Sequence, residues 1–99
     1  MKRPKKTIIG GKEWRIVYNK NPGGCFDGSK YLIKIGTLYS KDIPAILLHE
    51  IVEAILTERS HRYRLYNDCE YQNYLFSLNH DEFTNFIMDL ALALKDIIK

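Results

Sequence analysis

The hydrophobic pattern of this 99-residue chain changes its period near residue 42. Before that point, apolar residues alternate in KEWRIVYN (12–19) and again in KYLIKIG (30–36), which is the period of half-buried strands. The segment between them holds Asn21 to Gly24 and Asp27-Gly28, which are residues typical of turns and hairpins. The first half of the chain therefore predicts a small, mainly antiparallel sheet.

After Asp42 the apolar residues follow a helical period. Asp42 is a suitable N-cap and Pro44 falls in the first turn, so we expect a helix from there to about Glu58. Residues 62–66 and 73–78 look like two short extended arms of an inserted hairpin. A last amphipathic helix is expected from about His80 to Ile98, because Asn79 and Glu82 are spaced like a capping box. Together these elements predict one α+β domain.

The charges are unevenly distributed along the chain. The net charge is +3, but four of the positive residues lie within positions 1–6, and the rest carries 11 basic against 12 acidic residues. We therefore expect residues 1–6 to form a disordered basic tail and residues 7–99 to form the domain. Without a basic stripe on the domain, no dedicated nucleic-acid binding is expected. No segment resembles a signal peptide or reaches the ~18 apolar residues of a membrane span, so a cytoplasmic protein is predicted.

The segment LLHEIVEAIL (47–56) places three polar residues on an otherwise apolar helix. At ~100° per residue, Glu53 lies about 40° and Glu50 about 100° from His49, on the arc opposite the apolar side chains. A His and a carboxylate at i and i+4 can bind one cation together, while Glu50 flanks that pair. The alternative is an ordinary solvent-facing stripe, but such a stripe normally carries Lys or Arg, and this one does not.

One helix supplies only two ligands, whereas a catalytic zinc site usually has three. His80 is the preferred third ligand, because projection on the last helix turns it toward the apolar stripe of that helix. His61 is the less favoured alternative, since basic residues surround it. The set His49, Glu53 and His80 matches the His₂Glu donor set of hydrolytic zinc sites, which leave a fourth position for water.

These features resemble a known family, the small zincin-like metallopeptidases encoded in bacterial and phage genomes. The likeness covers roughly residues 24–98: the strand YLIKIG, the turn TLYSKDIP, the helix LLHEIVEAIL and NHDEF at the start of the last helix. It implies a minimal zincin-like fold with a central active-site helix. It also implies His49, Glu53 and His80 as zinc ligands and Glu50 as the general base toward a metal-activated water.

The resemblance further implies a peptide or small protein substrate, paired in extended form with the strand that precedes the active-site helix. Glu53 departs from the better-known zincin pattern, because a carboxylate binds zinc less selectively than an imidazole, so another divalent ion is an alternative. Tyrosines of the inserted hairpin (Tyr63, Tyr66, Tyr71 and Tyr74) are candidates to stabilise the transition state. The oligomeric state and the substrate are not predicted.

Two other functional classes compete with a peptidase. The first is an inactive scaffold of the same fold that binds a protein partner, with structural metal or none. The second is a small nucleic-acid accessory protein that acts through the basic start of the chain and its aromatic residues. A Glu50→Gln variant separates the first from a peptidase, since only a peptidase would lose its function.

Overall fold

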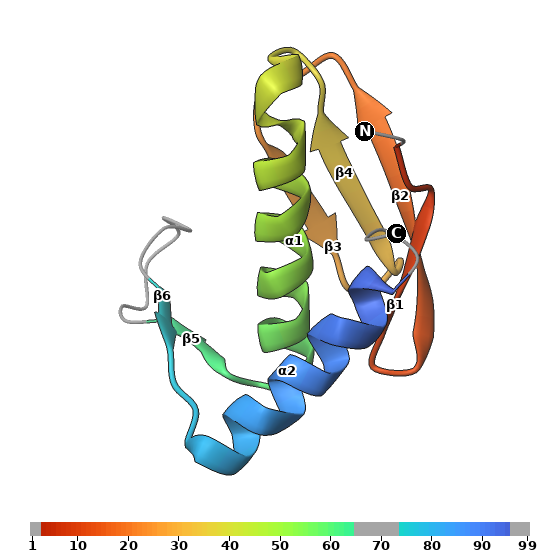
Figure 1. The fold of residues 1–99 in the computed structure, drawn as a ribbon. Helices are drawn as coiled ribbons and strands as arrows, with labels where there is room; N and C mark the ends of the chain where they lie inside the picture. The colour runs from red at the N-terminus through yellow and green to blue at the C-terminus, as the bar shows by residue number, and fades with distance from the viewer. Residues whose placement is uncertain (1–2, 65–73, 96–99) are drawn as a thin grey trace.

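The computed structural model describes residues 3–64 and 74–95 and shows an α+β fold (Figure 1). A sheet of four strands is covered on one face by two helices. The strands are β1 (Lys6–Ile9), β2 (Lys12–Asn19), β3 (Gly24–Asp27) and β4 (Leu32–Gly36), and their spatial order is β1-β2-β4-β3. The predicted fold class is confirmed.

The sheet is mixed, because the two inner strands β2 and β4 run parallel while both outer pairs are antiparallel. Gly10 and Gly11 close the β1–β2 hairpin, and both have a positive φ, a conformation that glycine adopts without strain. The predicted hairpin at Asp27-Gly28 joins β3 to β4. Strand β3 therefore lies at the edge of the sheet, and the helix that follows β4 packs against both β3 and β4.

A short 3-10 turn, η1 (Ser40–Asp42), leads into helix α1 (Ile43–Glu58), which begins and ends where the sequence predicts. The inserted hairpin is present as β5 (Arg62–Arg64) paired with β6 (Tyr74–Phe76). Helix α2 (His80–Leu94) starts with the predicted capping box between Asn79 and Glu82. Residues 96–98 of the predicted last helix lie outside the described part of the chain.

The core lies between the sheet and the two helices. Alternation in the strands turns Trp14 and Ile16 of β2 toward the helices, and α1 buries one apolar stripe against them. Helix α2 adds Ala93, and its backbone carbonyl accepts a hydrogen bond of 2.7 Å from the buried Thr7 hydroxyl of β1. The core comprises Ile9, Trp14, Ile16, Ile33, Ile35, Ile43, Leu47, Ile51, Ala54, Ile55 and Ala93.

Residues 3–6 lie along β2, although the sequence suggested a free tail there. The Lys5 carbonyl accepts a hydrogen bond of 2.8 Å from the Ile16 N–H, and the Pro4 carbonyl accepts one of 2.6 Å from the Tyr18 hydroxyl. Lys6 is the first residue of β1 and pairs with Arg15. The basic start of the chain is therefore attached to the sheet from Pro4 onward.

In residues 3–64 and 74–95, neither helix is both long and apolar enough to cross a bilayer. Cys25 is an exposed free thiol, whereas Cys69 lies outside the described residues.

Candidate metal centre

Helix α1 carries the candidate site on the side that faces β3. Asp42 is its N-cap and Pro44 lies in its first turn, where the missing N–H has no hydrogen-bonding role. The stripe of Leu47, Ile51 and Ile55 is buried against the sheet. This orientation leaves His49, Glu50 and Glu53 together beside the outer strand.

The three polar side chains converge as the helical spacing predicts. His49 Nε2 lies 3.0 Å from Glu53 Oε2 and 3.8 Å from Glu50 Oε2. One ligand atom from each of the three residues lies within 4.8 Å of the others. Ligand atoms of a tetrahedral zinc site are about 3.3 Å apart, given metal–ligand bonds of ~2.0–2.1 Å. The group therefore has the composition and the spacing to hold a divalent ion.

Glu50 is buried, with 6% of its surface exposed, whereas the sequence placed it on a wet stripe beside the site. The cause is the close approach of β3. A Cβ atom on Gly24 would lie 2.9 Å from Ile46 Cγ2 and 3.1 Å from Glu50 Cγ, so only glycine leaves room for the strand to pack here. Glu50 thus belongs to the cluster itself, between helix and strand.

Burial sets the electrostatics of this carboxylate. Desolvation raises the pKa of Glu50, the positive charge that His49 can carry opposes the rise, and the Glu53 carboxylate adds to it. Within the described residues, no hydrogen bond to the Glu50 carboxylate is present, and His49 Nε2 lies 3.8 Å from Glu50 Oε2. Partial loss of water makes the negative charge of this carboxylate costly, and a cation beside it would compensate that cost.

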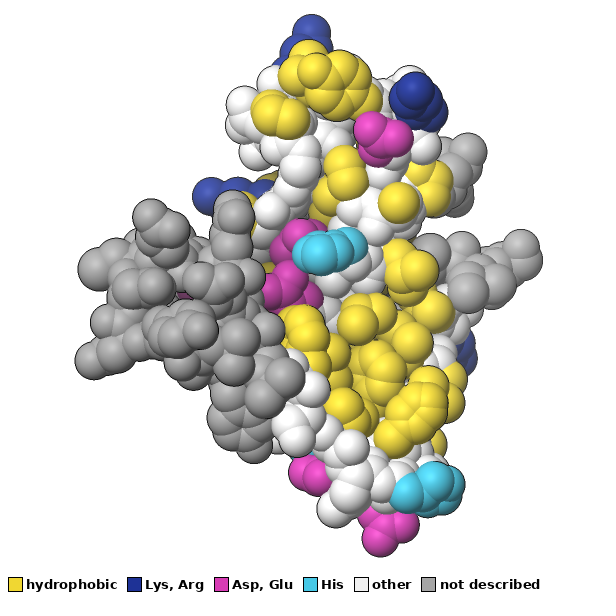
Figure 2. Space-filling model, turned by 90° about the vertical axis from the view of Figure 1, so that its left-hand side faces the viewer, with side chains coloured by type: hydrophobic (Ala, Val, Ile, Leu, Met, Phe, Trp, Pro, Cys, Tyr) yellow, Lys and Arg dark blue, Asp and Glu magenta, His cyan; other side chains and the backbone are white. Residues whose placement is uncertain are grey.

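His49 and Glu53 are more accessible than Glu50. His49 exposes 68% of its side chain and Glu53 19%. Figure 2 shows acidic side chains and a histidine gathered on this face, above a continuous hydrophobic surface formed over the helices. Solvent and a ligand can therefore reach the imidazole from one side while the Glu50 carboxylate closes the other.

His80 is not brought to this group. It exposes 91% of its side chain, and its Nδ1 lies 3.9 Å from Asp81 Oδ1. The expectation that His80 points toward the core is wrong, because the contacts of α2 with the core begin at Phe86 and continue through Leu90 and Ala93. The first turn of α2 extends past the end of α1, where there is no core to face (Figure 1).

His61, the less favoured candidate, lies just before β5 and contacts the first turn of α2. It is 5% exposed, and its Nδ1 lies 3.3 Å from Glu82 Oε2. The other oxygen of Glu82 accepts a hydrogen bond of 2.8 Å from the Asn79 N–H, which confirms the predicted capping role. The side chains of the candidate tyrosines of the hairpin lie outside the described residues.

A depression of about 550 Å³ adjoins the cluster. The pair Gly23-Gly24 suggested only a turn in the sequence, yet its backbone forms one wall of this depression, and the exposed Asp42 carboxylate lines it as well. Asp42 makes no side-chain cap hydrogen bond, so its carboxylate is not used by the helix end. The lining residues are Gly23, Gly24, Asp42, Ala45, Ile46, His49 and Glu50.

No protein-family model matches the chain, and comparisons with curated proteins and with solved structures found no match either. The resemblance to small zincin-like metallopeptidases is therefore supported by the His49, Glu50 and Glu53 triad on α1 alone.

Proposed function

We propose that the cluster on α1 binds one divalent metal ion and that the protein is a metal-dependent peptidase. The observation that carries the proposal is the buried Glu50 carboxylate beside His49 and Glu53, with all three ligand atoms within 4.8 Å. The imidazole nitrogen of His49 and the carboxylate of Glu53 suit zinc as ligands, and the carboxylate also suits manganese. The Glu50 carboxylate lies beside this pair. An ordinary i, i+4 surface pair needs only His49 and Glu53, and it does not explain a buried acid next to them.

The residues divide naturally into two roles. His49 and Glu53 are the accessible pair at 3.0 Å and would hold the ion. When bound, the metal would supply Lewis-acid chemistry, polarising a water molecule or a peptide carbonyl. Glu50 would accept the proton from the attacking water and return it to the leaving amine, and its raised pKa brings it closer to the range in which a general base works well.

The depression beside the cluster fits an extended peptide. The sequence suggested that the strand before α1 would pair with substrate, but β4 is bonded on both sides, to β2 and to β3. The strand available is β3, which in the described part of the chain pairs with β4 only. Because the Gly36 N–H donates to the Gly23 carbonyl, alternation along the antiparallel ladder turns the N–H and C=O of Gly24 away from β4.

A Cβ atom on Gly24 would lie 3.1 Å from Glu50 Cγ, so a peptide added along β3 at Gly24 would run near the proposed base. Main-chain hydrogen bonds to Gly24 would hold the backbone of the substrate, while Ala45 and Ile46 line the same depression. We infer that the substrate is an unfolded segment or a peptide rather than a folded protein.

The test is a cleavage assay with purified protein after removal of metal and addition of zinc or manganese. A peptide mixture is incubated with the wild type, with Glu50→Gln and with His80→Ala, and the products are identified by mass spectrometry. We expect cleavage by the wild type and by His80→Ala, and at least a hundredfold loss in Glu50→Gln, the loss expected when the general base is removed. Cleavage that persists in Glu50→Gln, or none in the metal-loaded wild type, would refute the peptidase.

A second function is favoured by a specific observation, the exposed apolar side chains of the two helices. Five large hydrophobic residues on α1 and α2 are 44–65% exposed, and Figure 2 shows hydrophobic side chains forming one surface there. Such a surface suits a protein-binding module on the same scaffold. In that case Glu50→Gln would keep partner binding, whereas substitutions on the apolar surface would abolish it. These residues are Leu48, Phe83, Ile87, Met88 and Leu92.

A further inference from the structure

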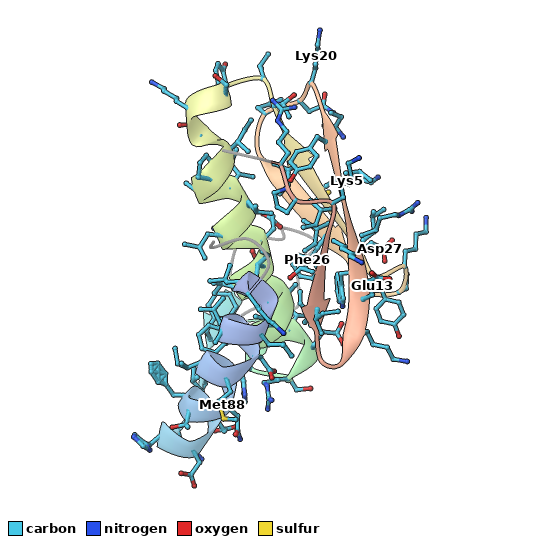
Figure 3. All side chains as sticks on the ribbon, turned by 45° about the vertical axis from the view of Figure 1, so that its right-hand side comes forward. Lys5, Glu13, Lys20, Phe26, Asp27 and Met88 are labelled. Carbon is cyan, nitrogen blue, oxygen red and sulfur yellow. The ribbon has the colours of Figure 1, made fainter. Side chains whose placement is uncertain are left out.

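The sheet face turned away from the helices gathers cations. Because Trp14 and Ile16 of β2 point into the core, Arg15 between them points outward, and Lys34 does the same between Ile33 and Ile35 of β4. Figure 3 shows Lys5 and Glu13 on this side of the sheet, and Met88 on the opposite side, on α2. We call this surface the basic face, and it comprises Lys5, Lys6, Lys12, Arg15, Lys30 and Lys34.

The net charge of the chain hides this arrangement. Without its first six residues the chain is nearly neutral, which argued against nucleic-acid binding. In three dimensions the charges separate, because Asp42, Glu50 and Glu53 lie on α1 or at its start, behind the sheet. Two carboxylates, Glu13 and Asp27, accompany the six cations of the basic face. The basic stripe that the sequence lacked is formed by folding.

A shallow hollow of about 400 Å³ lies on the basic face. Its single carboxylate, Glu13, forms an ion pair of 3.2 Å with Lys6. Within the described residues, Lys5 and Arg15 of this hollow form no such ion pair, while the positive charge of Lys30 also acts on the Asp27 carboxylate. The hollow therefore carries a local positive charge that a phosphate would neutralise.

Tyr31 supplies an exposed aromatic ring to the same hollow. Its φ is positive, a backbone conformation that is unfavourable for a residue with a side chain and that the surrounding contacts must hold in place. Its carbonyl accepts a hydrogen bond of 2.9 Å from the Arg15 N–H, and its ring packs edge-on against Trp14 with centroids 5.7 Å apart. Lys12 Nζ lies 6.0 Å from the ring centroid. The fold thus holds one half-exposed ring in place among cations.

We propose that the basic face binds single-stranded nucleic acid, with phosphates on Lys5, Arg15 and Lys30 and a base stacked on Tyr31. Cationic surfaces with an aromatic platform are the common means by which proteins bind unpaired strands, because every base offers a face for stacking. An anionic membrane is disfavoured, since membrane-binding surfaces add protruding apolar groups to their cations. Large exposed apolar side chains such as Leu48 and Met88 lie on the helices, outside the basic face.

The proposal is tested by fluorescence anisotropy with fluorescein-labelled 12-mers of dT and of U, titrated with the full chain between 50 and 200 mM salt. Three phosphate contacts predict a slope of log K against log salt of about −2, and hence about a twentyfold loss of affinity over that range. Arg15→Gln with Lys30→Gln should reduce the slope to about −0.7. Tyr31→Asn, which tolerates the positive φ but lacks the ring, should weaken binding about tenfold.

The matched control is Lys20→Gln with Lys41→Gln, which removes the same charge away from the hollow and should keep at least half of the affinity. Thermal unfolding of each variant checks that the fold is retained. The proposal is overturned if neither oligonucleotide binds, if the two double variants lose affinity equally, or if phosphatidylserine vesicles bind while the oligonucleotides do not. Metal binding at α1 is measured separately, so either result stands without the other.

Discussion

Replacing Glu50 by Gln should stabilise the metal-free protein at neutral pH. The wild-type side chain is 6% exposed, and desolvation raises the pKa of its carboxyl group, so its charge is costly in the folded protein. A polar group that loses all its water without gaining a partner costs about 1–3 kcal/mol, and Glu50, which lines the depression, loses only part of its water. Since the Gln amide is neutral but still needs partners, we take the lower end, about 1 kcal/mol, which corresponds to a rise in Tm of about 4–8 °C for a domain of this size.

The effect should depend on pH in a defined direction. Burial raises the pKa of Glu50, so the folded protein binds this proton more tightly than the unfolded chain does. Its contribution to stability is fully present below the ordinary pKa of 4.5 and is lost as the pH rises through the raised value. The advantage of Glu50→Gln should therefore be small at pH 4 and largest at pH 8.

The assay is thermal unfolding followed by circular dichroism, with a chelator present, at several pH values between 4 and 8. Glu53→Gln is the matched control, because this residue is less buried and lies 3.0 Å from the His49 imidazole, so its loss should bring no gain. A Glu50→Gln variant that is less stable than the wild type at pH 8, or equally shifted at every pH, would show that the buried carboxylate is well compensated and would refute the reasoning.

Three other changes test the site and its support. His49→Ala should weaken zinc binding by at least about a hundredfold in calorimetric titration, while the exposed His80→Ala should leave it unchanged; equal losses would contradict the assignment. Gly24→Ala should lower the free energy of unfolding in urea by about 1–3 kcal/mol, because its Cβ would lie 3.0 Å from the Lys34 carbonyl oxygen, and no loss would mean that the strand can move away. Ile51→Ala should cost about 2–5 kcal/mol in the same assay, since its side chain is fully buried; a cost below about 1 kcal/mol would place the core elsewhere.

Local signals in the sequence predicted the elements well. The alternation in 12–19 is strand β2, the helical period from Ile43 is α1, and the capping box starts α2 at His80. Each of these depends on residues within a few positions of one another. The parallel pairing of β2 with β4 could not be predicted in this way, because it depends on how β3 crosses to the outer edge of the sheet.

The same distinction between local and long-range determinants applies to the candidate site. His49 and Glu53 meet because they lie one turn apart on one helix, which the spacing alone determines. The burial of Glu50 depends on Gly24 of a distant strand, and nothing near position 50 reveals it. The place of His80 depends on how far α2 extends past α1, so helical projection could not predict its exposure.

Binding of a divalent ion to α1 through His49 can be observed by nuclear magnetic resonance of the imidazole nitrogens during a zinc titration. The chain has three histidines, His49, His61 and His80, so each ring can be assigned with single substitutions. The His49 nitrogens should shift to saturation at about one equivalent of zinc, while the nitrogens of His61 and His80 stay in place. A titration that moves His61 or His80 instead of His49, or that moves none of the three, would contradict zinc binding through His49.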